Sequence, residues 1–308
     1  MPVPAPNEIL VSVKASALNR ADLSQREGNY PAPPGAPPDI LGMEFAGEVA
    51  GVGTEVVAWQ PGDRVFGIVG GGGNAEYLVT DSQSVARIPD RLSWTDAAAI
   101  PEVFITAHDA LFTQAALQRD ERVLIHAVGS GVGLAATQLV RAYGAIPFGT
   151  ARSSDKVERA REFGLKDGIV VADDVSVITA AADALTQGKG FEVTLDLLGG
   201  AYLVASIQAA ARRGRIMLIG TIAGRTATIP LGMMLVKRLL LRGTVLRARS
   251  IEEKRAATAA FARDVLPLLA SGTVVPTVDR VYALEEIRAA HERLGSNETF
   301  GKVVLRMN

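Results

Sequence analysis

The chain has 308 residues, of which 48% are hydrophobic and 21% charged, a length that accommodates two domains. Its formal net charge of −1 excludes the strongly basic surface by which proteins bind nucleic acids or anionic membranes. It has no cysteine, which excludes disulfides and thiolate zinc sites, and its three histidines (His108, His126 and His291) are too far apart to suggest a metal site.

The first third of the chain is typical of short strands joined by turns. Ile9–Lys14 alternates apolar and polar residues, and Gly42–Val56 is interrupted by glycines. Further strands are predicted at Val65–Gly67 and Ala75–Thr80, and the prolines of Pro31–Pro38 indicate a rigid loop. This pattern predicts a small antiparallel β-barrel.

From about Ser93 onwards, apolar strands alternate with helices. This alternation predicts a doubly wound parallel sheet and hence an α/β fold. The predicted strands are Val123–Ala127, Ile146–Thr150, Val193–Leu198 and Arg215–Gly220, and the predicted helices follow Gly133 or cover Asp155–Phe163 and Tyr202–Ala211.

The C-terminal part predicts two more helices and a last strand. One helix is expected over Ile251–Ala270, with a kink at Pro267. The other is expected over Tyr282–Leu294 and ends at Gly295. The strand Gly301–Leu305 has no partner nearby in the sequence, so we expect it to return to the first domain.

Residues 122–145, RVLIHAVGSGVGLAATQLVRAYGA, combine a strand, a glycine turn and a helix. Glycines at 129, 131 and 133 permit a tight turn and a close approach of the backbone to a phosphate, and the helix N-terminus favours an anion. The full G-x-G-x-x-G pattern is absent, because Val128 and Ser130 occupy its first two glycine positions if Gly133 is the last. The segment predicts a pyrophosphate site; the alternative is a glycine-rich turn in an ordinary α/β protein.

The residues after the next strand bear on the choice of nucleotide. An NAD site would place an acidic residue there to bind the ribose 2′-OH. This chain instead has Arg152, Ser153, Ser154 and Lys156, and Asp155 lies beyond the position that the ribose requires. Cations and hydroxyls suit a 2′-phosphate, so NADP(H) is expected as the cofactor. The alternative reading is a solvated helix start that Ser153 or Ser154 caps.

Several segments together resemble the zinc-less, zeta-crystallin-like quinone oxidoreductases of the medium-chain dehydrogenase/reductase family, and most of all their stress-inducible branch. The segments are ASALNRADLSQREGNYP, DILGMEFAGEV, PGDRVFGI, GGGNAEYLVT, AAAIPEVFITAHDAL, VLIHAVGSGVG, DLLGG and GKVVL. The resemblance implies a Rossmann doubly wound parallel sheet plus a GroES-like β-barrel catalytic domain, with NADPH as hydride donor and quinones or activated enones as acceptors. The expected division is a GroES-like part at 1–101, a Rossmann domain at 102–243 and a return segment at 244–308.

The resemblance also bears on zinc. Zinc-dependent relatives carry a cysteine where this chain has Asn19, and a histidine where the triplet Gly42-Met43-Glu44 has methionine. Asn19 and Met43 are not zinc ligands of the usual strength. We therefore expect chemistry without zinc on a carbonyl compound that is already electron-poor.

The roles that the resemblance implies fall into a catalytic pair and a cofactor set. Asn19 and Tyr30 would lie beside the nicotinamide and its acceptor. The rest of the cofactor set comprises Thr106 at the nicotinamide; Ser130, Gly131, Val132 and Gly133 at the pyrophosphate; Arg152, Ser153 and Lys156 at the 2′-phosphate; Gly220, Thr221, Ile222, Leu246, Arg247 and Ala248 along the nicotinamide; and Lys302 from the last strand.

No obligatory general acid is evident from the sequence. Tyr30 is expected to hydrogen-bond the developing oxyanion while solvent supplies the proton, so Tyr30→Phe would lower turnover without abolishing it. Two other functions stay open: an enoyl reductase acting on 2-enoyl thioesters, and a non-catalytic NADPH-binding structural or sensor protein.

The remaining expectations concern the setting of the protein. A cytoplasmic location is expected because the first residues do not resemble a signal peptide. The family implies a homodimer through the strand Gly243–Arg247. Relatives begin with an additional strand or two before the segment MPVPAPNEIL, so either the native start lies upstream of Met1 or the barrel is short of an edge.

Overall fold

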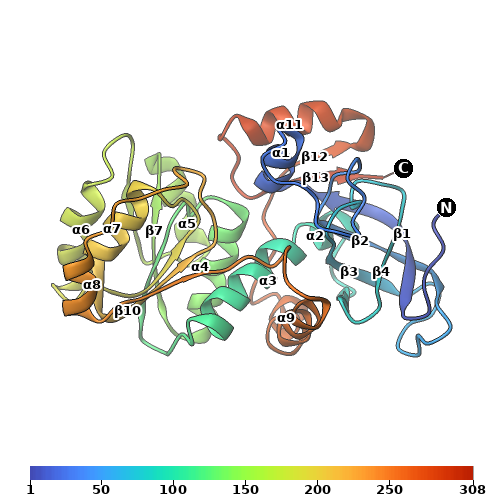
Figure 1. Ribbon diagram of the computed structural model, residues 1–308, viewed down its shortest axis with the longest axis horizontal. Coiled ribbons are helices and arrows are strands. Elements are labelled where there is room, and N and C mark those ends of the chain that lie inside the picture. Colours follow the sequence, from blue (N-terminus) through green and yellow to red (C-terminus); the bar gives the residue numbers. More distant parts are fainter. Residues whose placement is uncertain (308) are drawn as a thin grey trace. The chain divides into compact units, whose positions relative to one another are not determined.

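A computed structural model describes residues 1–307 of the chain, which divide into two compact units (Figure 1). Unit 1 joins the stretch from Met1 to Ile105 with the stretch that begins at Leu246. Unit 2 is the continuous stretch Thr106–Val245.

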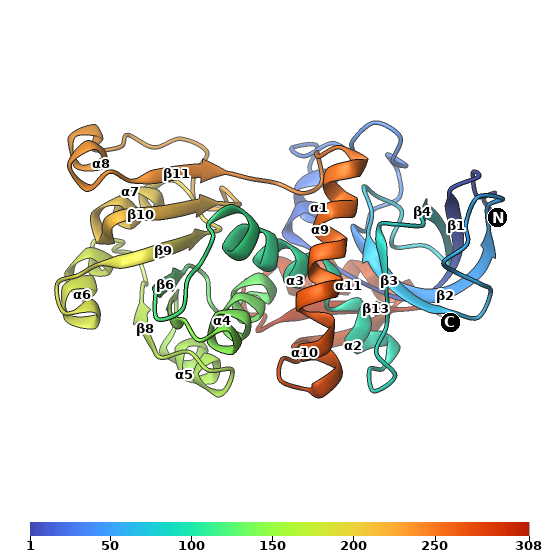
Figure 2. The ribbon, with the colours of Figure 1, turned by 90° about the horizontal axis from the view of Figure 1, so that it is seen from below.

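Unit 2 is built on a six-stranded sheet in the order β11-β10-β9-β6-β7-β8, with every neighbouring pair parallel (Figure 2). The predicted doubly wound parallel sheet is therefore confirmed. Its strands are β6 (Arg122–Ile125), β7 (Ile146–Ala151), β8 (Asp167–Val170), β9 (Phe191–Asp196), β10 (Ala210–Leu218) and β11 (Leu240–Gly243).

Helices cover both faces of this sheet (Figure 1). They are α4 (Gly131–Tyr143), α5 (Ser154–Glu162), α6 (Val177–Thr186), α7 (Ala201–Ala209) and α8 (Leu231–Lys237), and a π-helix, Asp109–Gln114, precedes β6. The strand order reverses between β6 and β9, where the crossovers leave in opposite directions. Ligands of open α/β sheets bind outside the carboxyl ends of the strands at such a switch point, so β6 and its turn are the first place to look for a site.

Unit 1 contains a seven-stranded sheet with the order β12-β13-β1-β2-β3-β5, and β4 pairs with β1. The strands are β1 (Glu8–Ala17), β2 (Glu44–Val52), β3 (Arg64–Ile68), β4 (Tyr77–Asp81), β5 (Val85–Arg87), β12 (Val278–Ala283) and β13 (Lys302–Arg306). The long strand β1 is antiparallel to β2, to β4 and to β13. The expected return of the last strand to the first part of the chain is thus confirmed.

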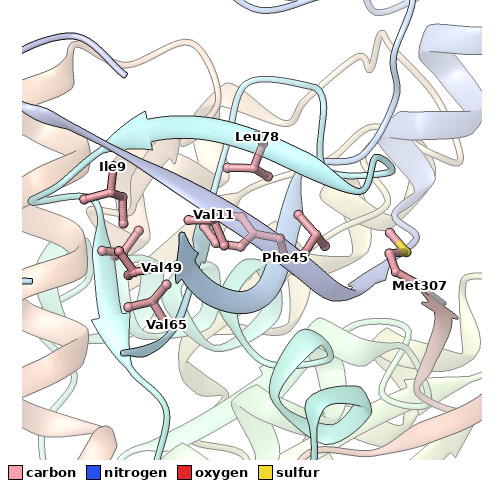
Figure 3. Close-up of a cluster of buried hydrophobic side chains, with 9 residues drawn as sticks. Ile9, Val11, Phe45, Val49, Val65, Leu78 and Met307 are labelled. Carbon is pink, nitrogen blue, oxygen red and sulfur yellow. The ribbon is translucent and has the colours of Figure 1, made fainter. Parts of the chain in front are cut away.

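The core of unit 1 forms where the inward-facing side chains of these strands meet (Figure 3). Every second residue of β1, from Ile9 to Val13, is buried there, as expected for a strand with one face on a core. Phe45 of β2 and Met307, which follows β13, pack into the same cluster. Residues from both ends of the chain therefore share one hydrophobic core.

Two of the predicted C-terminal helices differ from those in the structure. The stretch Ile251–Ala270 forms two helices, α9 (Ile251–Asp264) and α10 (Leu266–Ser271), because Pro267 lacks the N–H that would continue α9 and instead lies in the first turn of α10. The prediction of a helix from Tyr282 was wrong: Tyr282 pairs with Leu305 in β12, and α11 covers Ile287–Gly295. The β-branched residues of β12 and a parallel partner in β13 override the helical spacing.

Three shorter helices complete unit 1: α1 (Arg20–Arg26), α2 (Trp94–Ala98) and α3 (Pro101–His108), whose first residues belong to unit 1. In unit 2 the helix predicted over Tyr202–Ala211 ends at Ala209, because Ala210 already pairs with Phe191 in the sheet. Across residues 1–307, no helix combines the length and the apolar character that a membrane crossing requires.

Candidate active site

The turn after β6 is shaped by Ser130 and Gly133. Ser130 adopts an extended conformation and caps α4, since its hydroxyl accepts a hydrogen bond from the N–H of Gly133 at 3.1 Å. A Cβ atom on Gly133 would lie 2.6 Å from the carbonyl oxygen of Ala127 and 2.7 Å from that of Val128. Only glycine permits the helix to begin so close to the end of the strand.

This turn can hold a phosphate group. The N–H groups of a helix's first turn have no partner within the helix, and the helix dipole adds positive potential there. Gly131 and Val132 belong to that first turn, and both remain partly accessible to solvent. The close strand-to-helix approach and the accessible N–H groups fit the pyrophosphate of a dinucleotide.

A set of polar residues follows the carboxyl end of β7. Ser153 caps α5, with its hydroxyl 3.5 Å from the N–H of Lys156. Arg152 is exposed, and its positive charge acts on Tyr202, whose pKa burial raises and Arg152 partly lowers. Because β7 neighbours β6, these residues lie beside the glycine turn along the same edge of the sheet.

A third segment of the cofactor set follows β10. Asp196, at the end of β9, accepts hydrogen bonds from the backbone N–H groups of Leu198 and Gly199 at 2.8 and 2.9 Å, which fixes the turn after that strand. A Cβ on Gly220 would lie 2.5 Å from the carbonyl oxygen of Leu197. The residues after Gly220 are thereby held against this turn.

The predicted cofactor residues that follow β6, β7 and β10 thus lie at one edge of the sheet, where these strands have their carboxyl ends. Thr221 and Ile222 are exposed there, and Thr106, the first residue of the unit, is partly buried in α3. The described contacts do not join Thr106 to the glycine turn.

In unit 1 the structure builds a buried polar network around Lys302, which we call the Lys302 network (Asn19, Glu44 and Lys302). The ammonium of Lys302 donates to Asn19 Oδ1 at 2.6 Å and to the carbonyl of Leu18 at 2.8 Å, and it lies 2.7 Å from Glu44 Oε1. Asn19 Nδ2 in turn donates to Glu44 Oε1 at 2.9 Å. The side chains of Lys302 and Glu44 are 5% and 0% exposed, so these charges depend on one another.

The network changes the role that the sequence suggested for Lys302. An ammonium has three N–H donors, and all three have acceptors within unit 1. Lys302 therefore has no N–H left with which to donate to a cofactor. Its visible effect is to fix the orientation of the Asn19 amide.

Asp22 completes the surroundings of Asn19. It accepts hydrogen bonds from the backbone N–H groups of Asn19 at 2.7 Å and of Gly42 at 3.1 Å, and it is fully buried. Burial raises its pKa, while the two N–H groups and the charge of Lys302 oppose that rise. The spacing Asn-x-x-Asp is a helix-start pattern that could have identified Asp22 from the sequence.

The residues of this network do not fit a zinc ion. Asn19 and Met43, the two positions that the resemblance led us to test for zinc ligands, offer an amide and a thioether, and Asn19 Oδ1 already binds a cationic nitrogen. The carboxylate of Glu44 is also committed to Lys302. Among residues 1–307, no three histidine, cysteine or acidic side chains are arranged to hold a metal.

Tyr30 lies beside a buried arginine. The guanidinium of Arg247 is 5.0 Å above the Tyr30 ring; it donates to the carbonyl of Gly70 at 2.9 and 2.6 Å and to the side chain of Gln25. Its Nη1 is buried without a hydrogen-bond partner among the described residues. Burial raises the pKa of Tyr30, which keeps this phenol neutral. On either side of Arg247 in the sequence, Leu246 is buried and Ala248 is exposed.

One acidic residue of this region was missed at the sequence level. Glu102 is the second residue of α3, and its backbone N–H donates to Glu44 Oε2 at 2.8 Å. Burial, and then the negative charge of Glu44, raises its pKa to about 8. The available signal was a lone acidic residue within the apolar run AAAIPEVFI.

Two family models match the chain. The alcohol dehydrogenase GroES-like domain matches residues 5–90, and the zinc-binding dehydrogenase family matches residues 131–263. The first match confirms that the chain contains a GroES-like domain, and the matched residues lie within unit 1.

Curated relatives align along nearly the whole chain. A quinone oxidoreductase of Pseudomonas aeruginosa is 32% identical over 98% of this chain and 92% of its own length. A quinone oxidoreductase of Lama guanicoe is 30% identical over 99% of this chain and 90% of its own. A highly-reducing polyketide synthase of Aureobasidium melanogenum is 32% identical over 97% of this chain but 13% of its own length.

Solved structures have the same fold. A quinone oxidoreductase of Pseudomonas syringae superposes with a TM-score of 0.88 at 29% identity, covering 99% of this chain and 93% of its own. A mycobacterial protein complexed with NADPH gives 0.87 at 27% identity, with the same two coverages. The enoyl reductase CurK gives 0.87 at 28% identity, covering 100% of this chain and 93% of its own.

We expect Gly133→Ala to damage the glycine turn. The added methyl group would meet two backbone carbonyls that cannot move independently of β6, so the free energy of unfolding should fall by about 1–3 kcal/mol. Dinucleotide affinity, measured by calorimetry, should fall with it. Gly232→Ala in α8 is the control, since no atom lies within 4 Å of its Cβ position and alanine favours a helix. An equal effect of both substitutions would contradict the close-approach argument.

We expect Lys302→Met to be strongly destabilising. The substitution leaves the carboxylate of Glu44 buried without its cation. The free energy of unfolding, measured with urea, should therefore fall by about 3–5 kcal/mol. Lys302→Met combined with Glu44→Gln should cost less than the sum of the two single variants, because no unpaired charge remains. Strict additivity would show that the two side chains do not depend on each other.

Proposed function

The chain belongs to the medium-chain dehydrogenase/reductase family, and from that premise we propose that it is an NADPH-dependent quinone oxidoreductase that works without zinc. It is an oxidoreductase by family; the cofactor, the acceptor and the independence from zinc are the proposed part. The observation that carries the proposal is the Lys302 network. In it the ammonium of Lys302 is bound to Asn19, the residue at which the resemblance led us to test for a zinc ligand.

The preference for NADPH rests on the polar group after β7. Arg152, Ser153 and Lys156 follow β7 and would bind the ribose 2′-phosphate, since two positive charges there would favour the phosphorylated nucleotide. Asp155 is not proposed to bind the ribose, because it lies within the first turn of α5 and its carboxylate is 3.7 Å from the guanidinium of Arg159. The NADPH bound to the mycobacterial neighbour is consistent with this preference.

The acceptor class follows from the absence of a suitable metal position. Zinc assists alcohol and aldehyde chemistry by polarising the oxygen. The donors around Asn19 do not suit zinc, and this supports an acceptor that is already electron-poor. Quinones and activated enones meet that requirement, and the two quinone oxidoreductase relatives support the quinone.

NADPH supplies a hydride when it is bound, and the residues of the chain hold and orient the reactants. The glycine turn and α4 would bind the pyrophosphate, and Ser153 and Lys156 the 2′-phosphate. Asn19, whose amide is held by Lys302 and Glu44, would support the nicotinamide end. The neutral phenol of Tyr30 would hydrogen-bond the oxygen that becomes negative as the acceptor is reduced.

An enoyl reductase is the second candidate. The polyketide synthase relative and the CurK structure favour it, since both are as similar to this chain as the quinone oxidoreductases are. A reduced enoyl thioester also passes through an oxyanion that Tyr30 could stabilise. The choice between the two therefore depends on the acceptor alone.

The strand expected over Gly243–Arg247 is not present as predicted, because β11 covers Leu240–Gly243 and ends there. We therefore propose a homodimer through β11, at the edge of the unit 2 sheet. The strand β11 pairs only with β10, so its outer edge carries unpaired backbone groups. Leu231, Leu235 and Val236 of α8 expose 65%, 77% and 71% of their surface beside it. Pairing of two such edges would cover both the strand and the apolar side chains.

The cofactor assignment predicts the effect of Lys156→Glu. The new carboxylate would repel a 2′-phosphate, so the KM for NADPH should rise roughly tenfold or more while that for NADH changes little. The assay is NADPH and NADH oxidation over a panel of quinones, simple enones and a crotonyl thioester. Lys166→Glu, an exposed lysine of the same unit, is the matched control.

The same panel separates the candidate functions. Turnover of an ortho-quinone well above the crotonyl thioester supports the quinone oxidoreductase, and the reverse supports the enoyl reductase. Tight NADPH binding without turnover of any acceptor would identify a structural or sensor protein. Equal use of NADH and NADPH by the wild type would disprove the cofactor assignment.

The dimer predicts a separate measurement. Leu235→Glu should convert the protein to a monomer in sedimentation, because a charge would be buried between two apolar helices. Val57→Glu, at a 97% exposed position of unit 1, should leave the assembly unchanged. A wild type that sediments as a monomer would contradict the dimer.

A further inference from the structure

Arg247 holds an unpaired hydrogen-bond donor in the interior of unit 1. The residue is 5% exposed, and its Nε and Nη2 donate to the carbonyl of Gly70 and to the side chain of Gln25. Its Nη1 is buried and has no partner among residues 1–307. A buried donor without an acceptor costs free energy, and more so when it carries charge. A ligand that supplies the missing acceptor would remove this cost.

A second cation without a partner lies near Arg247. Lys254 is the fourth residue of α9 and is only partly exposed, and its ammonium has no hydrogen bond or ion pair to any of residues 1–307. Burial, and then the positive charge of Arg247, lowers the pKa of Lys254. Two like charges thus act on each other without an anion from the described part of the chain.

The acidic residues of this region are engaged elsewhere. Asp81 is paired with Arg255 at 2.5 Å. Glu253, which precedes Lys254, accepts a hydrogen bond from the backbone N–H of Ser250. Burial, and then the charge of Glu44, raises the pKa of Glu102 to about 8, so this carboxyl is mostly uncharged at pH 7. None of these three acids therefore neutralises the two cations.

Lys254 lines a small cavity that lies wholly within unit 1. Its volume of about 10 Å³ holds roughly one water-sized group. Thr258 and Ser84 also line it, although the hydroxyl of Ser84 already donates to Asp81. The other lining residues are apolar: Ile68, Ile105, Ala257 and Leu246, which directly precedes Arg247. A cation beside an apolar wall fits the carboxylate of an organic acid better than a hydrated inorganic anion.

We propose that Arg247 and Lys254 form an anion site that binds a carboxylate group on the acceptor. This inference rests on the proposed reduction of a quinone or enone, and it narrows the acceptor to one that bears an acidic substituent. The acceptor is favoured over the cofactor because the Tyr30 ring, 5.0 Å from the guanidinium of Arg247, is proposed to bind the acceptor oxygen. The phosphates of the cofactor, by contrast, have their proposed positions in unit 2.

The first test uses the protein without cofactor and needs no turnover. Calorimetry should show that benzoate binds the wild type roughly tenfold or more tightly than benzamide, its uncharged analogue, because hydrogen bonds to a charged group are the stronger ones. Lys254→Met removes the ammonium but keeps most of the apolar stem, so it should abolish this difference. Lys166→Met, at an exposed position of unit 2, is the matched control and should keep it.

Arg247→Lys tests the other half of the site. The variant keeps a positive charge but lacks Nη1, so benzoate should bind roughly tenfold more weakly than to the wild type. Its thermal stability is measured in parallel, because the bonds to Gly70 and Gln25 are lost as well. Lys254→Met makes the test independent of such damage, since Lys254 has no side-chain hydrogen bond or ion pair within residues 1–307 to lose.

The second test compares a carboxylated benzoquinone with its methyl ester as acceptors. The wild type should have the higher kcat/KM with the acid, and Lys254→Met should lower the ratio of the two values roughly tenfold. A variant that instead raises the KM for NADPH would assign the cations to the cofactor and overturn the inference.

The remaining outcomes are equally decisive. Equal binding of benzoate and benzamide to the wild type, or a Lys254→Met variant that keeps both preferences, would show the inference to be wrong. Sulfate that displaces benzoate at equal concentration would reveal a site for inorganic anions only and would also overturn it. A wild type that reduces neither acceptor would contradict the proposed function, whereas the benzoate titration would still report on the anion site.

Discussion

The geometry of unit 1 depends on one buried ammonium. Lys302 lies on the last strand of the chain, yet its three acceptors belong to the first fifty residues. Taking such a charge out of water is costly unless every donor finds an acceptor. Because all three do, the cost is offset, and the strand β13 is tied both to β2 and to the start of α1.

The same arrangement organises the chemistry around it. Glu44 uses one oxygen for Lys302 and Asn19 and the other for the backbone of Glu102, so a single carboxylate fixes a side-chain amide and a helix start. Hydrogen bonds to a carboxylate and an ammonium thus hold the surroundings of Asn19 in place. Burial, and then the negative charge of Glu44, raises the pKa of its neighbour Glu102 to about 8.

Local patterns predicted much of this molecule. The strand, turn and helix around Gly133 follow from residues within one short segment, and so does the cap that Ser153 provides for α5. Tyr282 was misplaced because its helical spacing is local, whereas the strand that it forms depends on Leu305. Side-chain spacing cannot reveal a partner strand that lies beyond the next helix.

The candidate site was harder to predict for the same reason. Asn19 and Lys302 were identified individually, but their contact joins residues 283 positions apart, and no pattern in the sequence links them. Glu102 was missed because its chemistry comes from burial and from Glu44, 58 positions away. Resemblance to a family could suggest which residues matter, whereas the folded arrangement gave their partners.

The divided construction of unit 1 has a consequence for biosynthesis. Unit 2 is continuous and emerges from the ribosome in full before Lys302 is translated. Until then β1 lacks β13, and Glu44 and Asn19 lack their cation. The carboxylate of Glu44 therefore stays without its cation until Lys302 has left the ribosome exit tunnel, and unit 1 cannot complete its interior before then.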